Sequence, residues 1–161
     1  MSKVTILSGS NLDDRSFYLQ QAIKLIRERV GAVIAQSSVY ESEPWGYASS
    51  NSFYNQLIVV ETEFNPQDLL RQLQEIEHQL GRIRDRGKRY IDRTLDLDIL
   101  FYDDLVMNSE RLVIPHPQVA NRRFVLVPLA ELFPENIHPV LCKTFAQLLE
   151  FCPDKGNVFK L

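Results

Sequence analysis

The sequence predicts an α+β fold in which helices pack on an antiparallel or mixed sheet. Apolar alternation typical of strands and the three- and four-residue apolar spacing typical of helices take turns along the chain. Asp103 and Asp104 form a turn signal between residues 95–102 and 105–107, which predicts a hairpin and therefore antiparallel pairing. No linker composition interrupts the pattern, so residues 1–161 are expected to form one domain.

The first half of the chain predicts three strands separated by two helices. The strands are expected at residues 4–8, 32–40 and 53–64. One helix has an apolar face formed by Leu19, Ala22, Ile23, Ile26 and Val30. Asp14 is its expected N-cap and Gly31 its expected C′ residue. Asn65 and Pro66 are typical of the start of the second helix, which Gly81 is expected to end.

The second half continues the alternation. Residues 95–102 predict a long strand and residues 112–114 a short extended piece. Helices are expected at residues 124–132 and 144–151, and residues 158–159 predict a closing strand.

Residues 41–52 form a predicted loop of unusual composition. Turn formers are mixed there with Trp45 and Tyr47. Aromatic side chains in a loop need something to pack against, so this segment is interpreted as a binding loop.

Charge and hydropathy argue against two broad classes of protein. A formal net charge of −3 argues against bulk attraction to nucleic acid. No run of about 18 apolar residues occurs, so no membrane span is expected. The N-terminus has neither a basic leader nor a cleavable apolar region, which makes the cytoplasm the expected location.

Basic charge is nevertheless concentrated in residues 81–93. This segment carries Arg82, Arg84, Arg86, Lys88, Arg89 and Arg93. Only Asp85 and Asp92 oppose them. Such a cluster in an otherwise acidic chain predicts a site for a small polyanion, because the guanidinium fork binds phosphate oxygens in pairs. A solvated charge run stays an alternative for Arg86 and Lys88.

The most informative segment is Arg-Thr-Leu-Asp-Leu-Asp-Ile-Leu at residues 93–100. On a strand, Asp96 and Asp98 point to one face, about 7 Å apart along the chain, while their apolar neighbours enter the core. Two close carboxylates repel each other unless a cation lies between them, and oxygen ligands suit Mg²⁺. A solvated sheet face is the bland alternative, but the adjacent arginines favour a magnesium site that binds a phosphate-bearing molecule such as ATP. No P-loop motif occurs.

Two further groups of polar residues are weaker candidates. His116 lies between two prolines, and only Arg122, a few residues later, makes it interesting as a site residue. Gln74 and Glu77 share one face of the second predicted helix, where they fit a ligand contact and an exposed face about equally well.

These residues carry a family resemblance that covers nearly the whole chain. The motifs are Gly-Ser-Asn at residues 9–11, S-x-x-Y-x-[ST]-x-P-x-G at 37–46, Asn55, E-x-x-x-G-R-x-R at 77–84, the Asp96 block, E-R-L-x-I-P-H-P at 110–117 and N-R-x-F at 121–124. The chain thereby resembles the 6-hydroxymethyl-7,8-dihydropterin pyrophosphokinases of folate biosynthesis. The expected fold is a ferredoxin-like three-layer sandwich with a mainly antiparallel sheet.

The resemblance implies transfer of pyrophosphate from ATP to the pterin hydroxymethyl group, and it implies a role for each matched residue. Asp96 and Asp98 would bind two Mg²⁺ ions, with Asp96 also near the substrate. The catalytic set would be completed by Arg82 and Arg93. ATP would contact Gln74, Arg82, Arg84, Arg93, Ile99, Arg111, His116 and Arg122. The pterin would contact Ser42, Pro44, Trp45, Phe53, Asn55 and Phe124, with the two phenylalanines stacked on its ring.

One stretch departs from the family pattern. Tyr90, Ile91 and Asp92 stand where the family usually has Trp-Gly-Pro, in a segment about one residue longer. A monomer without nucleic acid or membrane partners is expected. Two alternatives stay open: another magnesium-dependent phosphoryl or nucleotidyl transferase, and a ferredoxin-like RNA-binding module.

Overall fold

The computed structural model describes residues 1–81 and 92–161 of the chain. Its centre is a six-stranded sheet in the order β5-β1-β4-β3-β8, with β2 also paired to β4. The strands are β1 (Ser2–Ser10), β2 (Gly31–Gln36), β3 (Tyr40–Ser42), β4 (Phe53–Thr62), β5 (Asp96–Tyr102) and β8 (Val158–Lys160). All pairings among these strands are antiparallel, as predicted.

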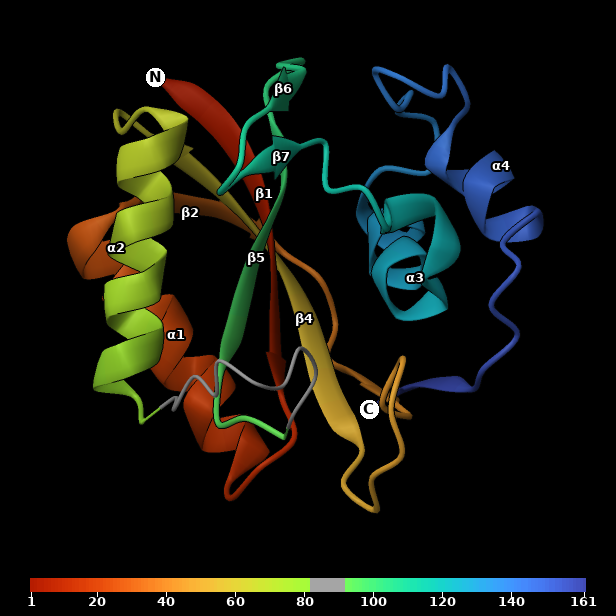
Figure 1. The fold of residues 1–161 in the computed structure, drawn as a ribbon, viewed down its shortest axis with the longest axis horizontal. Helices are drawn as coiled ribbons and strands as arrows, with labels where there is room; N and C mark the ends of the chain where they lie inside the picture. The colour runs from red at the N-terminus through yellow and green to blue at the C-terminus, as the bar shows by residue number, and fades with distance from the viewer. Residues whose placement is uncertain (82–91) are drawn as a thin grey trace.

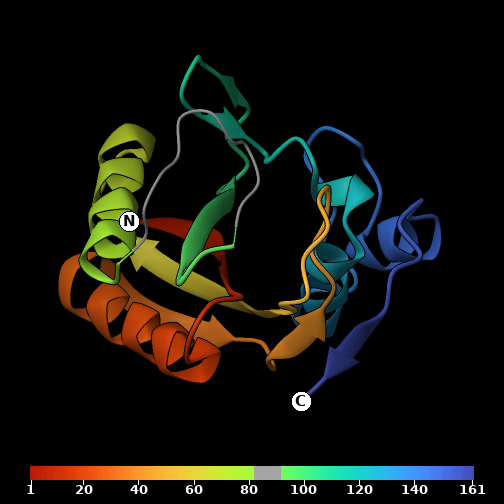
Figure 2. The same cartoon turned by 60° about the horizontal axis from the view of Figure 1, so that its bottom comes forward.

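Helices cover both faces of the sheet and complete three layers (Figures 1 and 2). The helices on one side are α1 (Arg15–Arg29) and α2 (Pro66–Gln79), and those on the other are α3 (Arg123–Leu132) and α4 (Phe145–Glu150). Successive residues of β1 point to opposite faces of the sheet and pack in two separate cores. Ile6 packs in the cluster that includes α1 and α2, and Leu7 packs in the cluster that includes α3 and α4. This arrangement confirms the ferredoxin-like sandwich.

The predicted helix ends are confirmed by their hydrogen bonds. Asp14 accepts from the backbone N–H of Phe17 at 3.1 Å, and Asn65 accepts from that of Asp68 at 2.8 Å. Gly81 adopts a φ of +90°, the left-handed conformation expected after a helix.

Gly31 follows α1 for a different reason from the one predicted. It is the first residue of β2 and does not have a positive φ. A Cβ at this position would lie 1.9 Å from the carbonyl oxygen of Glu61, so β4 approaches too closely for any other residue.

The segment 32–40, predicted as one strand, is divided in two. β2 ends at Gln36, and β3 begins at Tyr40. The side chain of Ser37 accepts from the N–H of Leu57, and the N–H of Ser37 donates to the carbonyl of Leu57. These bonds to β4 turn the chain between the two strands.

The predicted hairpin onto β5 is wrong. β6 (Met107–Asn108) pairs instead with β7 (Val113–Ile114), in a separate two-stranded sheet. The turn is tied to β1, because Asp103 donates its N–H to the carbonyl of Lys3 and accepts the N–H of Lys3 on its side chain. The chain then leaves β5 before it can pair back.

After β7 the chain returns to the sheet, because the N–H of His116 donates to the carbonyl of Leu100 at 2.9 Å. A short 3₁₀ helix (Val119–Asn121) then leads into α3. Within the described ranges, no helix combines the length and apolar character that crossing a membrane requires.

Candidate active site

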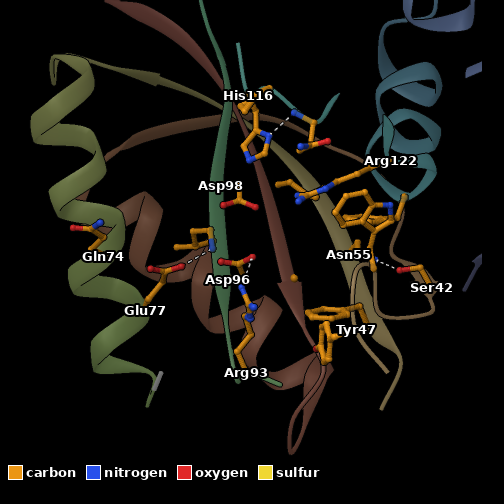
Figure 3. Close-up of a pocket in the computed structure, with 18 of the residues that line it drawn as sticks. Ser42, Tyr47, Asn55, Gln74, Glu77, Arg93, Asp96, Asp98, His116 and Arg122 are labelled. Carbon is orange, nitrogen blue, oxygen red and sulfur yellow. Dashed lines mark hydrogen bonds and ion pairs between the residues drawn. The ribbon is translucent and has the colours of Figure 1, made fainter. Parts of the chain in front are cut away.

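One cavity of about 390 Å³ gathers most of the residues singled out by the sequence. It lies across the ends of β1, β4 and β5, between α2 and the start of α3 (Figure 3). Described residues that line it and were predicted as site residues are Ser42, Trp45, Phe53, Asn55, Gln74, Arg93, Asp96, Asp98, Arg111, His116, Arg122 and Phe124.

Strand β5 presents the two aspartates to this cavity. Asp96 and Asp98 are partly exposed, whereas Leu97 and Ile99 are buried, which confirms the predicted alternation. Arg93 is only 9% exposed, and its Nη1 lies 3.2 Å from Oδ2 of Asp96. The arginine therefore orients one carboxylate from the strand's entry end.

The aspartates make a donor set that fits magnesium shared with a ligand. In the part of the chain that the structure describes, no group of three or more His, Cys, Asp or Glu side chains is arranged to enclose a metal ion. Mg²⁺ is commonly held by one or two carboxylates together with substrate phosphates and water. Asp96 and Asp98 fit that open arrangement rather than a closed structural site.

His116 faces the same space as a neutral hydrogen-bond donor (Figure 3). Its Nδ1 accepts the N–H of Gln118 at 3.1 Å, so the neutral ring carries its proton on Nε2. Burial, helped by the charge of Arg122 and opposed by that of Asp96, lowers the pKa of His116 to about 4. At neutral pH the ring can donate one hydrogen bond into the cavity without adding a charge.

Arg122 is a buried cation held by aromatic faces. It is 9% exposed, and its guanidinium carbon lies 4.5 Å from the ring centre of Trp45 and 5.8 Å from that of Phe124. Its Nε has no hydrogen-bond partner among the described residues. A buried donor of this kind fits an anionic ligand in the cavity.

The opposite part of the cavity suits a flat, polar ring. Phe53 and Phe124 both line it together with Asn55, which lies on β4 and is only 2% exposed. Asn55 donates from Nδ2 to Oγ of Ser42 at 2.7 Å, which fixes the orientation of the amide (Figure 3). Gly9, which has no side chain, leaves space beside this amide. A Cβ at Gly9 would lie only 3.2 Å from Oδ1 of Asn55.

Comparison with known proteins identifies this combination of features. Residues 5–134 match the family described as 7,8-dihydro-6-hydroxymethylpterin-pyrophosphokinase (HPPK). The chain belongs to the HPPK family. It is 41% identical over 128 residues to the 2-amino-4-hydroxy-6-hydroxymethyldihydropteridine pyrophosphokinase of Bacillus subtilis (strain 168), covering 79% of this chain and 75% of the relative. Its counterpart in Porphyromonas gingivalis (strain ATCC 33277) is 40% identical over 141 residues, 86% of this chain and 95% of the relative.

Solved structures agree on the fold. A crystal structure of an HPPK-DHPS chain with substrates superposes with a TM-score of 0.76 at 15% identity, and a Plasmodium falciparum HPPK-DHPS triple mutant with STZ-DHP gives 0.77 at 18%. Each match covers 92% of this chain but only 43% of the longer one. The chain therefore spans less than half of those chains. Membership of the HPPK family favours a pyrophosphokinase over the two alternatives left open by the sequence.

Four site residues expected from the HPPK resemblance are not among the described residues that line the cavity. Ile99 packs in the core with α1 and α2 and is not among the residues lining the cavity, and Pro44 does not line it either. Arg82 and Arg84 fall outside the described residues. For Ile99, strand alternation already predicted a core position, so only its backbone is left for a nucleotide contact.

Glu77, considered above as a ligand contact or an exposed residue, instead joins α2 to β5 by a buried hydrogen bond. Its side chain lines the cavity but is only 2% exposed, and its Oε2 accepts the backbone N–H of Leu97 at 2.8 Å. This bond ties α2 to the strand that carries the aspartates (Figure 3). Gln74, on the same helix, lines the cavity without such a tie to β5.

Sequence reasoning missed residues that act by holding others. Asn11 was noted only as part of the Gly-Ser-Asn motif, yet it is 1% exposed and hydrogen-bonded both to the loop 43–52 and to residues 92–93. Tyr47 was noted only as an aromatic in a binding loop, and it lines the cavity. The signal for Tyr47 was its place in a polar loop. For Asn11 the Gly-Ser-Asn motif marked the position, but it did not indicate which residues the buried side chain bonds.

Proposed function

We propose that the chain transfers a pyrophosphoryl group from ATP to the hydroxymethyl group of 6-hydroxymethyl-7,8-dihydropterin, releasing AMP and forming the pterin diphosphate of folate biosynthesis. Membership of the HPPK family supports this reaction. The observation that carries it for this chain is the composition of a single cavity, with an aromatic and amide end beside Asn55 and a carboxylate and cation end beside Asp96 and Arg122.

At the first end the pterin ring lies between Phe53 and Phe124. Asn55 has one amide hydrogen engaged by Ser42 and keeps a second hydrogen and its carbonyl oxygen for the ring's lactam edge. Backbone groups of Ser42 and Trp45 contact the same edge, and Pro44 shapes the turn between them. Stacking and amide pairing together select a planar heterocycle with a donor and acceptor edge.

At the second end ATP binds through its phosphates, with Asp96 and Asp98 as the residues that hold two Mg²⁺ ions. Bound there, magnesium would neutralise phosphate charge and increase the acidity of the accepting hydroxyl group. The remaining phosphate and nucleotide contacts are assigned to Gln74, Arg82, Arg84, Arg93, Arg111, His116 and Arg122, with a backbone contact at Ile99.

The reaction needs positioning and charge stabilisation rather than covalent catalysis. The hydroxymethyl oxygen attacks the β-phosphorus of ATP, the bond from that phosphorus to the α,β-bridging oxygen breaks, and AMP leaves with that oxygen. Arg93 keeps Asp96 oriented, while His116 donates from Nε2 and Arg122 from its guanidinium to phosphate oxygens. Because His116 is neutral, it stabilises phosphate without repelling Arg122.

A product assay tests the proposal. Purified protein is incubated with Mg-ATP and 6-hydroxymethyl-7,8-dihydropterin, and the nucleotide products are separated. Formation of AMP in proportion to pterin diphosphate is expected; ADP or acceptor-independent hydrolysis would contradict it. The chain is further proposed to act as a cytoplasmic monomer, which predicts a single species near 18.7 kDa by sedimentation.

A further inference from the structure

Asp92 is the centre of a hydrogen-bonded cluster beside the cavity. Its Oδ1 accepts from Nδ2 of Asn11 at 2.9 Å and from the hydroxyl of Tyr47 at 3.0 Å. Its Oδ2 accepts from Oγ of Ser49 at 3.0 Å and from Nδ2 of Asn51 at 2.8 Å. Three of these four donors belong to the loop 43–52 between β3 and β4, so one carboxylate holds most of that loop.

The protonation states keep the cluster intact near neutral pH. Burial tends to raise the pKa of Asp92, but the hydrogen bonds from Ser49, Tyr47, Asn11 and Asn51 outweigh it and lower the pKa overall. Burial, together with the bond to Asp92, raises the pKa of Tyr47 to about 12. The carboxylate is thus ionised and the phenol is a donor, so the bonds to Asp92 are charge-assisted.

The cluster also reaches the catalytic strand through Asn11. The backbone N–H of Arg93 donates to Oδ1 of Asn11 at 2.8 Å, and the N–H of Asn11 donates to the carbonyl of Arg93 at 3.1 Å. Arg93 in turn pairs with Asp96. On its other side the loop carries Trp45, whose ring lies against Arg122. The loop therefore contacts Arg122 through Trp45 and reaches Asp96 through Asn11 and Arg93.

We propose that Asp92 is a positioning residue that fixes the loop 43–52, and with it Trp45 and Tyr47, in the shape that the pterin requires. This inference rests on the proposed function. Asp92 belongs to the stretch that departs from the family pattern, so the resemblance itself assigns it no role. A second anchor at the loop's end, Arg15 bonded to the carbonyl and hydroxyl of Ser52, leaves the middle of the loop to Asp92.

The test uses Asp92→Ala and Asp92→Asn, with Asp104→Ala as control because it removes an equal charge from an exposed turn. The asparagine variant keeps the size but turns an NH₂ group toward two donors, so it should behave like the alanine variant. Pterin binding is measured with a non-hydrolysable ATP analogue and magnesium present. Trp45, the chain's only tryptophan, reports the loop directly through its fluorescence and acrylamide quenching.

Both Asp92 variants should bind the pterin about 10- to 100-fold more weakly, the scale expected for misplaced binding groups. They should also show increased quenching of Trp45 and a KM for pterin that rises more than kcat falls. Affinity for the ATP analogue alone and all properties of Asp104→Ala should stay within about twofold of the wild type. A purely structural role would lower the unfolding temperature and leave pterin affinity and Trp45 quenching unchanged in the folded variants, which overturns the inference.

If the Asp92 variants do not fold, the combined variant Ser49→Ala/Asn51→Ala removes the two bonds to Oδ2 and leaves the aspartate in place. It should weaken pterin binding in the same direction by about fivefold or more, since lost charge-assisted bonds allow the loop to shift; unchanged affinity overturns the proposal. Failure of the proposed function looks different, because the wild-type protein itself would then bind no pterin and release no AMP.

Discussion

Replacing Asn55 by alanine is the most direct test of the proposed pterin end of the cavity. Asn55 is 2% exposed and lies on β4, opposite Gly9 on β1 and Tyr40 on β3. Its only side-chain hydrogen bond within the described residues is the one donated to Ser42. The substitution therefore removes the amide edge and leaves the strand pairing intact.

The expected loss follows from the groups left without partners. In the proposed complex, one amide hydrogen and the carbonyl oxygen of Asn55 pair with the ring, and each such bond contributes about 1 kcal/mol net. The ring's own buried polar groups then stay unsatisfied, which adds about 1–2 kcal/mol. A total of about 3–4 kcal/mol corresponds to a dissociation constant raised about 150- to 900-fold.

Calorimetric titration with a pterin analogue, in the presence of magnesium and a non-hydrolysable ATP analogue, measures this loss. Ser42→Ala is the matched control, because it removes the bond that orients Asn55 and leaves the ring's partners in place; about fivefold weaker binding is expected. Folding is checked by circular dichroism and thermal unfolding. A folded Asn55→Ala variant that binds within about threefold of wild type would refute the assignment of the ring to this end.

Three other substitutions address the rest of the cavity. Asp98→Ala should lower kcat on the order of 10³-fold with the unfolding temperature nearly unchanged, measured by AMP release, and retained activity would remove the metal assignment. Gly9→Ala places a methyl group 3.2 Å from Oδ1 of Asn55 and 3.5 Å from the Phe53 ring. Pterin affinity should therefore fall about tenfold while ATP affinity is unchanged. Equal losses of pterin and ATP affinity in the two titrations would argue against a pterin site beside Gly9. The lowered pKa of His116 adds stability at pH above its ordinary value of 6.5 that is lost as the pH falls toward about 4. Urea unfolding across this range should show a drop of up to about 3 kcal/mol in wild type and a smaller one in His116→Gln, and identical curves would contradict it.

The elements that the sequence predicts well are those decided by local chemistry. Asp14 and Asn65 satisfy the first N–H groups of helices wherever a helix begins, so their roles are visible without tertiary information. Likewise, the alternation around Asp96 reflects a strand with one buried face. That Asp96 and Asp98 share one face of the strand could therefore be predicted from residues only a few positions apart.

The features that the sequence does not predict depend on distant partners. Whether Asp103 turns the chain back onto β5 or bonds to Lys3 is decided by β1, a hundred residues earlier. The reason for Gly31 is likewise the carbonyl of Glu61. Asn11 and Asp92 are 81 positions apart, and nothing near either residue indicates the other. The hydrogen-bond partners of buried polar groups are brought together by the tertiary fold, so a local sequence pattern does not predict them.

Sheet geometry explains how the cavity's two ends are held in register. Gly9 on β1 is the partner of Asn55 on β4 and of Asp96 on β5. The amide and the first metal-binding carboxylate are therefore separated by two strand spacings, about 10 Å, with a residue lacking a side chain between them. That interval suits a bicyclic ring that lies over Gly9, with its lactam edge on Asn55 and its hydroxymethyl arm directed toward Asp96. If β4 or β5 shifted by one residue relative to β1, Asn55 or Asp96 would point to the other face of the sheet, into a hydrophobic core. In the proposed complex, the apolar residues that alternate with Asp96 and Asp98 would thus determine the distance between the pterin and the phosphates, so that packing and catalysis would depend on the same strands.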